Sequence, residues 1–590
     1  MDYSFCFYTQ ASLSFPHDGY KQYVASFINP LIQTMLNQEN ARISFCFSDA
    51  FINYLDKNFK EVNLFIQDFL KSNRMEMLSS SYNNKSMSSL VPRNRMSAVD
   101  KCTTIISKLY STRAVSAYYG SIWNTNLVNP MALLGLESLI ISSSAVTREI
   151  VDNTNFRMNK NGKKINVLKT DSVIETLILK YSNNEITYSE LDEQFTSYID
   201  NKNDDTIIMI NIDQVCKGDS FNSFNAIDII TKTISSISKK DSAFSLPKEI
   251  KVNELGYLDS AFYSHDVKKG YLTSPNQLFV TNGTYRYYEN RVLALYDLLQ
   301  NLKKTPTSKK SINELLLKSP SNSLYYLDAT ASCLRGKELQ LFYNTILEAQ
   351  RRLSDYDLYL ESYDLDDDEA LEYFLSNKTC SAVLSTRGAG LYEFCSIAMA
   401  KNVLASVAVF DEYKHQQRKA KSFTDKIAIK DKVYDLKDTL FTLEKKAKNK
   451  AEYTFSYTCE DFTITKNYKL SNCGIALNST ITNNLSEKLN LNYVLDAEYN
   501  VNKKEEDKIN DAIVDNTIVK YPNDVDHLTF TSSDSFSFTD KDIWQKMRTC
   551  LGEENFYLCT QGSMSFDLEL EGGESKTVQI KTKFTNSKEY

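Results

Sequence analysis

Apolar and polar positions alternate along the first 240 residues in two different ways. Short apolar runs predict strands at 5–8, 42–47, 74–79, 115–119, 136–142 and 205–212. Between several of these runs, apolar residues recur at helical spacing, which predicts helices at 20–37, 59–72 and 97–109 and another that ends near 134. The run at 205–212 (DTIIMINI) is nearly continuous, as expected for a strand buried on both faces. Strands and helices that alternate in this way predict a parallel sheet or barrel.

The pattern changes in the second half of the chain. Residues 285–355 carry helical periodicity, strongest at 288–302 and 338–353. From about 358 onward, short alternating segments separated by Asn, Gly and Asp predict an antiparallel β-sandwich, with strands at 454–457, 462–465, 563–570 and 577–584. We therefore expect three parts: an α/β part at 1–260, a helical segment at 261–357 packed on it, and an all-β part at 358–590.

Composition and charge narrow the class of protein. The net charge is −7, from 68 basic and 75 acidic side chains that are well mixed, so no basic face for nucleic acid is expected. No apolar run is long enough for a membrane span, and the first residues do not resemble a secretion signal. The eleven Cys are scattered without a CxxC pair, as expected for reduced thiols. These features predict a soluble cytoplasmic protein.

Metal and cofactor chemistry have no support in the sequence. The chain has four His, at positions 17, 265, 415 and 527, and none has a second His at metal-ligand spacing. No glycine-rich phosphate loop is present, because Gly388-Ala389-Gly390 fits a turn of the predicted sandwich. We therefore expect neither a metal nor a cofactor.

Several short motifs occur in a fixed order near the start of the predicted sandwich. Residues 363–368 read YDLDDD, 386–394 read TRGAGLYEF, 402–404 read NVL and 411–415 read DEYKH. This order resembles glycoside hydrolase family 57, in particular its 4-α-glucanotransferase branch, where an acidic strand precedes RGG-x-L-x-E-L, x-N-L-L and E-x-Y-H. Leu334-Arg335-Gly336 and the helix at 345–352 are similar to the family's helical segment. The resemblance covers most of 1–420 and implies a distorted, incomplete (β/α) barrel, a helical segment, a C-terminal sandwich and a substrate of the α-1,4-glucan class.

The same resemblance assigns positions to the catalytic carboxylates. Retaining glycosidases use a nucleophile and an acid about 5–5.5 Å apart. The family's nucleophile is the Glu of W-L-T-E-R-x-W, and residues 117–123 align with it so that Gly120 takes the Glu position and Trp123 the last Trp. No Asp or Glu occurs from 101 to 136, so a small shift of the alignment does not restore a carboxylate. Asp213, after the run at 205–212, could be the acid, or it could cap the next turn.

Other strand ends have residues suited to holding a sugar. The family's first-strand H-x-H-Q-P reads Tyr8-Thr9-Gln10-Ala11-Ser12 here, and its second motif, V-E-I-x-G-G-G-F-Y-E-P, retains Glu76 and Tyr82 but has Asn84 at the second acidic position. In a barrel, the ends of the strands form the binding face. The candidate carbohydrate-binding residues are Tyr8, Gln10, Tyr82, Asn83, Asn84, Tyr118, Tyr119, Trp123 and Asp213. Tyr is also common throughout this chain, at 37 copies, which offers a simpler explanation for the tyrosines.

Three functional hypotheses follow. The first is a pseudoenzyme that binds α-glucan or maltooligosaccharide, or that regulates or scaffolds a partner such as an active paralogue. The second is a purely structural or protein-interaction module on the same scaffold. The third is an active 4-α-glucanotransferase or α-amylase with relocated carboxylates. An open aromatic and amide-lined cleft would favour the first, a cleft filled by Tyr and Leu the second, and an acidic pair within about 6 Å the third. The sequence leaves the oligomeric state open.

Overall fold

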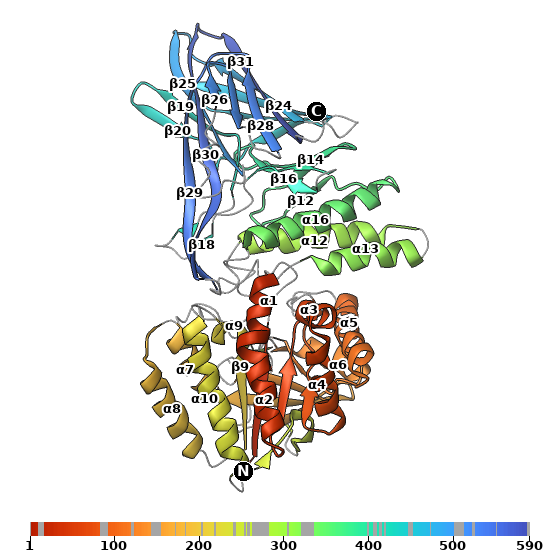
Figure 1. The fold of residues 1–590 in the computed structure, drawn as a ribbon. Helices are drawn as coiled ribbons and strands as arrows, with labels where there is room; N and C mark the ends of the chain where they lie inside the picture. The colour runs from red at the N-terminus through yellow and green to blue at the C-terminus, as the bar shows by residue number, and fades with distance from the viewer. Residues whose placement is uncertain are drawn as a thin grey trace. The chain divides into compact units, whose positions relative to one another are not determined.

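A computed structural model describes two units of the chain (Figure 1). It describes residues 2–586 except 10–16, 83–91, 120–122, 143–154, 172, 183, 202–204, 217–219, 240–242, 253–254, 257–259, 262–282, 304–305, 320–334, 398–399, 405–409, 412–415, 418–419, 447–451, 473, 501–512, 522–525 and 550–551. The first unit comprises Met1–Thr281, Pro320–Glu338 and Met547–Glu554. The second comprises Asn282–Ser319, Leu339–Lys546 and Asn555–Tyr590.

Parallel strands form a barrel in the first unit. In sheet order they are β3 (Met75–Met77), β2 (Ile43–Cys46), β1 (Asp2–Tyr8), β9 (Thr206–Asn211), β8 (Lys163–Asp171), β6 (Ser138–Ser142) and β4 (Ser116–Tyr118). Ser79, just after β3, closes the ring: its N–H donates to the Ser116 carbonyl, and the Tyr118 N–H donates to the Ser79 carbonyl, both at 2.9 Å. β7 (Phe156–Lys160) adds an antiparallel hairpin partner to β8, and β10 (Ala243–Phe244) pairs with β1.

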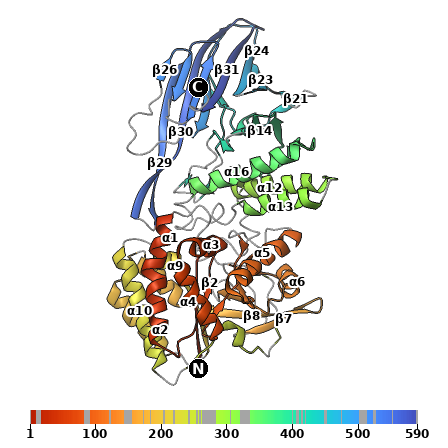
Figure 2. The same ribbon diagram turned by 45° about the vertical axis from the view of Figure 1, so that its right-hand side comes forward.

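Helices cover the outside of this sheet, as the two views show (Figures 1 and 2). They are α1 (His17–Tyr23), which continues through a π-helical turn into α2 (Asn29–Asn37), α3 (Asp49–Asn58), α4 (Lys60–Lys71), α5 (Pro92–Tyr110), α6 (Val128–Leu133), α7 (Val173–Ser182), α8 (Tyr188–Asp200), α9 (Ile212–Val215) and α10 (Ser220–Ser238). Outward-facing strand residues such as Phe5, Phe7 and Phe45 join the helices in one large core. Alternation along each strand sends the remaining residues into the barrel.

The inward-facing residues include both polar and apolar side chains. Ser44 and Glu76 are register neighbours on β2 and β3, and Ser116 on β4 is likewise buried. An inner cluster, separate from the outer core, contains Cys6, Tyr8, Cys46, Leu78, Tyr118, Ile140, Leu168, Ile207, Met209 and Val252. The lumen is therefore filled by side chains over this part of its length, as in other small barrels.

The helical segment forms part of the second unit. It contains α12 (Gly283–Gln300), α13 (Pro306–Lys318) and α16 (Arg335–Ser354). Its described polar contacts join α12 to the β-rich part of the same unit. The Tyr287 hydroxyl donates to Glu393 Oε1 at 2.7 Å, and Arg291 lies 3.4 Å from the other oxygen of that carboxylate. Arg291 and Glu393 are fully buried, so each compensates the charge of the other.

Antiparallel sheets make up the rest of the second unit. One five-stranded sheet is β12 (Ser362–Tyr363), β13 (Glu372–Ser376), β14 (Cys380–Ser385), β15 (Leu391–Ser396) and β16 (Lys401–Asn402). A second is β20 (Lys432–Asp435), β19 (Thr424–Ile429), β25 (Leu489–Tyr499), β30 (Gly552–Leu570) and β29 (Ser537–Thr549). An eight-stranded sheet is β21 (Thr442–Lys446), β22 (Glu452–Thr458), β23 (Phe462–Ser471), β24 (Gly474–Asn483), β31 (Ser575–Asn586), β28 (Asp526–Ser532), β27 (Ile518–Tyr521) and β26 (Ile513–Asp515).

The predicted fold class is thus confirmed. Apolar side chains from these sheets share one core, as expected for a sandwich. The turn that begins at Gly388 is structural: its φ is 75°, and a Cβ there would lie 2.3 Å from the Lys437 carbonyl oxygen. Within the described residues, no helix is both long and apolar enough to cross a membrane.

Candidate functional site at the barrel mouth

Tyr8 ends the first barrel strand and points into the lumen. Its hydroxyl donates to Glu175 Oε1 at 2.6 Å, and its ring meets the Tyr118 ring edge-on at 4.7 Å between centroids. β1 and β4 lie on opposite sides of the ring of strands, so the two tyrosines meet across the barrel. Burial raises the pKa of Tyr8 well above its ordinary value, and the Glu175 carboxylate and Tyr118 raise it further. Tyr8 is therefore a neutral hydrogen-bond donor.

Glu175 is a mouth residue that the sequence analysis missed. It lies in the first turn of α7, whose start is fixed by Asp171: the Val173 N–H donates to Asp171 Oδ1 at 2.9 Å. An acidic residue favours this end of a helix because the helix dipole is positive there. The sequence signal that could have identified Glu175 was a carboxylate shortly after the end of a parallel strand. It was overlooked because neither β8 nor α7 was predicted.

Asp213 lies beside the end of β1 through a direct contact with Thr9. The Thr9 hydroxyl donates to Asp213 Oδ1 at 2.6 Å, and both side chains are buried. The cap of the following turn is Asn211, whose Oδ1 accepts the Asp213 N–H at 2.8 Å. The described capping contact therefore comes from Asn211, whereas the Asp213 carboxylate reaches toward β1.

The other predicted residues have different surroundings. Tyr82 is half-buried, and the Lys101 ammonium lies 4.9 Å from its ring centroid. Tyr119 follows Tyr118 but faces the opposite way, into the core between sheet and helices, where burial raises its pKa. Trp123 begins β5 (Trp123–Asn124), which pairs with β11 (Ser260–Ala261). Gln10, Asn83, Asn84 and Gly120 lie outside the described residues.

The contacts of Tyr8 and Thr9 define the functional groups that lie at the barrel mouth. Two carboxylates, Glu175 and Asp213, are held by the consecutive residues Tyr8 and Thr9. The structure brings together Tyr8, Tyr118 and Asp213 from the predicted set and adds Glu175. Carboxylates and phenols can bond sugar hydroxyl groups, and paired carboxylates can also serve as acid and base. Below these polar groups, Leu78 and the rings of Tyr8 and Tyr118 fill the lumen.

Glu76 is a buried residue of β3 in the same barrel. Its Oε2 accepts the Lys248 N–H at 2.9 Å, and its side chain is almost fully buried. Burial is the main cause that raises its pKa, and the hydrogen bond from the Lys248 N–H opposes this effect. Among the residues that the structure describes, none is within hydrogen-bond geometry of its other oxygen or of the Ser44 hydroxyl. Glu76 thus tends toward the protonated form, which could donate a hydrogen bond.

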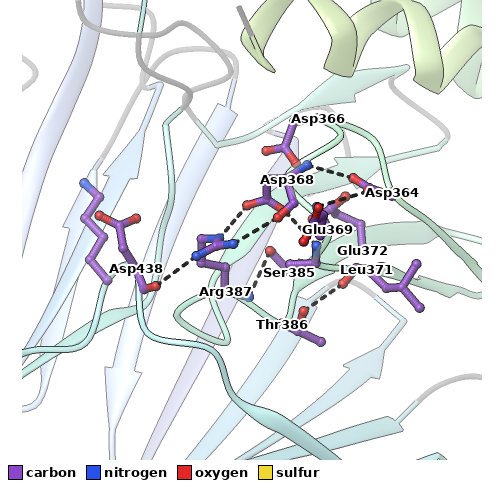
Figure 3. Close-up of polar contacts among 12 residues, drawn as sticks. Asp364, Asp366, Asp368, Glu369, Leu371, Glu372, Ser385, Thr386, Arg387 and Asp438 are labelled. Carbon is purple, nitrogen blue, oxygen red and sulfur yellow. Dashed lines mark hydrogen bonds and ion pairs between the residues drawn. The ribbon is translucent and has the colours of Figure 1, made fainter. Parts of the chain in front are cut away.

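A second acidic cluster lies in the other unit, on the loop between β12 and β13 (Figure 3). Asp364, Asp366 and Glu372 each have an oxygen within 4.8 Å of the others, an arrangement that could hold a hard divalent cation. Each carboxylate also accepts protein hydrogen bonds, for example from the Leu365 N–H to Glu372 at 2.7 Å and from the Tyr392 hydroxyl to Asp366 at 3.3 Å. The expectation of no metal remains a prediction.

Arg387 links this acidic loop to the next turn (Figure 3). Its Nε donates to Asp368 Oδ2 at 2.5 Å, and its Nη2 donates to the Asp368 carbonyl at 3.0 Å. A third contact reaches the Asp438 carbonyl at 3.4 Å. The motif that carried most of the resemblance therefore fixes the loop that precedes β13, and it has a structural role in this unit.

Known proteins resemble this chain in structure. The sequence matches no family model and no curated protein. In structure, it matches the 4-α-glucanotransferase of Thermococcus litoralis at a TM-score of 0.78 and 12% identity, over 99% of both chains. A GH57 branching enzyme from Thermococcus kodakaraensis matches 60% of this chain and 91% of its own, at a TM-score of 0.43 and 8% identity. An α-amylase from Thermotoga maritima matches 60% of this chain and 93% of its own, at a TM-score of 0.44 and 9% identity.

The first of these matches confirms the expected fold. Because it extends over 99% of both chains, it includes the barrel, the helical segment and the sandwich together. At 12% identity it concerns the fold alone, and function has to be argued from the residues of the site.

Proposed function

We propose that this chain is a family 57 relative that binds an α-glucan, such as a maltooligosaccharide, at the barrel mouth without cleaving or transferring it. One observation supports this most: the fold matches a 4-α-glucanotransferase throughout, while Gly120 stands at the position that corresponds to the family's nucleophile. Hydrolysis or transfer with retention needs a carboxylate at that position. Binding without turnover suits regulation or scaffolding of a protein partner, including an active paralogue.

The proposed binding residues combine aromatic rings with polar groups that bond hydroxyls. They are Tyr8, Gln10, Tyr82, Asn83, Asn84, Trp123 and Asp213. Tyr119 is left out because its ring packs in the outer core. The Lys101 ammonium beside the Tyr82 ring adds a donor next to an aromatic face.

A structural or protein-interaction module is the second candidate. The contact between Tyr8 and Tyr118, with Leu78 in the same cluster, supports it because these side chains fill part of the lumen. A relocated active site is the third candidate, and the observation in its favour is that the consecutive residues Tyr8 and Thr9 contact the carboxylates of Glu175 and Asp213.

Calorimetric titration of the full chain with maltoheptaose tests the first candidate. We expect saturable binding that Tyr82→Ala weakens at least tenfold, because a lost stacking contact of about 1.4 kcal/mol corresponds to a factor of ten. Tyr359→Ala is the matched control, since Tyr359 is a partly exposed tyrosine of the other unit. Absence of binding by the native chain, or equal affinity for the native chain and Tyr82→Ala, would contradict the proposal and favour the interaction module.

A further inference from the structure

An exposed tryptophan lies on the β29–β30 strand pair of the second unit. Trp544, one of two tryptophans in the chain, is 37% exposed. Its ring packs against the Tyr557 ring of the neighbouring strand at 5.4 Å between centroids and an angle of 62°. Leaving so large an apolar ring in water forgoes the free energy that its burial would release. Contact with Tyr557 limits the orientations that the Trp544 ring can adopt.

Tyr557 is held in turn by a directed chain of hydrogen bonds. The Thr560 hydroxyl lies 2.6 Å from the Tyr557 hydroxyl and donates its own proton to Asp542 Oδ1 at 2.7 Å. Because Thr560 donates its single proton to Asp542, Tyr557 donates to Thr560, and the Tyr499 carbonyl oxygen, 3.5 Å from the Tyr557 hydroxyl, is a second acceptor for the same proton. Thr560 is fully buried, so this series of hydrogen bonds holds the Tyr557 phenol from the interior of the protein. The aromatic pair is therefore preorganised, and little conformational entropy remains to be lost on binding.

The surroundings of the ring favour a small polyhydroxylated ligand over a protein. Within the described residues of β29 and β30, Trp544 is the single exposed large hydrophobic side chain. Protein interfaces use broader apolar patches. A pyranose ring presents one face of C–H groups, which match a single aromatic ring, and a rim of hydroxyls. Asp542, on the same strand as Trp544, is partly exposed and supplies a carboxylate acceptor for such hydroxyls.

We propose that Trp544 and Tyr557 form a saccharide-binding platform for a segment of α-glucan, in addition to the barrel mouth. The choice of α-glucan rests on the proposed function, whereas the platform itself rests on the exposed, fixed aromatic pair. The site adds a contact for a long glucan on the second unit and involves no chemical step.

Tryptophan fluorescence tests the platform separately from the barrel mouth. In Trp123→Phe, Trp544 is the only tryptophan, and in Trp544→Phe, Trp123 is the only one. We expect maltoheptaose to change the emission of Trp123→Phe saturably, and cellohexaose at the same concentrations to leave it unchanged. Adding Tyr557→Ala should weaken this response at least tenfold, while adding Tyr359→Ala should not.

The outcomes separate the two proposals. If Trp544→Phe responds to maltoheptaose but Trp123→Phe does not, the platform is refuted and the barrel site stands. The opposite pattern refutes the barrel site and supports the platform. An equal response of Trp123→Phe to both sugars overturns the assignment to α-glucan. Retention on immobilised amylose gives a second measurement: Trp544→Ala should elute earlier than Trp544→Phe, and equal elution counts against the platform.

Discussion

Single buried side chains in the barrel combine ionisable groups with close packing. Glu76 is buried inside the barrel, where its carboxylate accepts the Lys248 N–H. Tyr8 is likewise buried, and its neutral hydroxyl contacts Glu175. Burial that disfavours the charged form of Glu76 makes the stability of the barrel depend on pH.

We predict that Glu76→Gln stabilises the protein near neutral pH. The folded pKa of Glu76 is raised, so its contribution is fully favourable at low pH and is lost as pH rises from the ordinary value through the raised one. Glutamine remains neutral, can accept the Lys248 N–H and can donate to Ser44 or Ser116. In urea unfolding at pH 5 and pH 8, the advantage of Glu76→Gln should grow with pH, by about 1 kcal/mol.

The control for this prediction is Glu569→Gln. Glu569 is exposed, and a hydrogen bond from Lys488 lowers its pKa, so any pH effect should be small and of opposite sign. If native protein and Glu76→Gln lose stability in parallel between the two pH values, Glu76 ionises in the barrel as it does in water.

At the scale of elements, the sequence pattern predicted the barrel strands that consist of a strong apolar run. It missed a barrel strand in which polar and apolar residues are mixed. β1, β2, β3, β4, β6 and β9 fall within or around the predicted runs. β8 was missed because it reads KKINVLKTD, where polar residues interrupt the apolar run expected for a buried strand. α7 and α8, which follow β8 in the chain, were missed as well. α3 was missed because it starts shortly after β2.

The missed strand explains the missed site residue. Tyr8 and Asp213 could be predicted because each follows a recognised apolar run, so the end of the strand was known. Glu175 contacts Tyr8 across 167 residues of sequence, and that contact depends on β8 lying beside β9. Tyr118 and Tyr119 show another limit: alternation gives them opposite faces, but the direction of the lumen depends on barrel closure.

A buried ion pair joins two layers of the sandwich. Lys466 on β23 donates to Asp425 on β19 at 2.7 Å, both side chains are fully buried, and Tyr493 also donates to Asp425 at 2.7 Å. Burial raises the pKa of Asp425 and lowers that of Lys466. Each charge is therefore tolerated because the other is present.

We predict that Asp425→Asn destabilises the second unit by about 3–5 kcal/mol, because it leaves the Lys466 ammonium buried without an anion. Adding Lys466→Met should recover most of this loss, since methionine has a similar length and no charge. Scanning calorimetry of the full chain measures both effects. Breaking the exposed pair of Lys488 and Glu569 with Glu569→Gln should leave the transition unchanged. A double variant as unstable as the single one would show that the pair itself, and not the unpaired charge, carries the stability.

At the scale of the whole molecule, the chain combines a complete scaffold with altered mouth residues. The fold follows that of a 4-α-glucanotransferase over 99% of its length, although the two sequences are only 12% identical. Core positions tolerate such divergence because many apolar side chains of suitable volume can fill them. Catalytic positions do not, because each needs a particular functional group at a particular place.

We therefore predict that the native chain neither hydrolyses nor transfers glucosyl units of maltoheptaose or amylose. Loss of a catalytic nucleophile costs on the order of 10⁶-fold in kcat where it has been measured in a hydrolase. Gly120→Glu should also stay inactive, because Tyr8 and Gln10 stand where the family has its first-strand histidines. Product analysis by chromatography after prolonged incubation measures both. Turnover by the native chain that disappears in Asp213→Asn and in Glu175→Gln, with Glu569→Gln still active, would establish a relocated carboxylate pair and overturn the proposal of binding without catalysis.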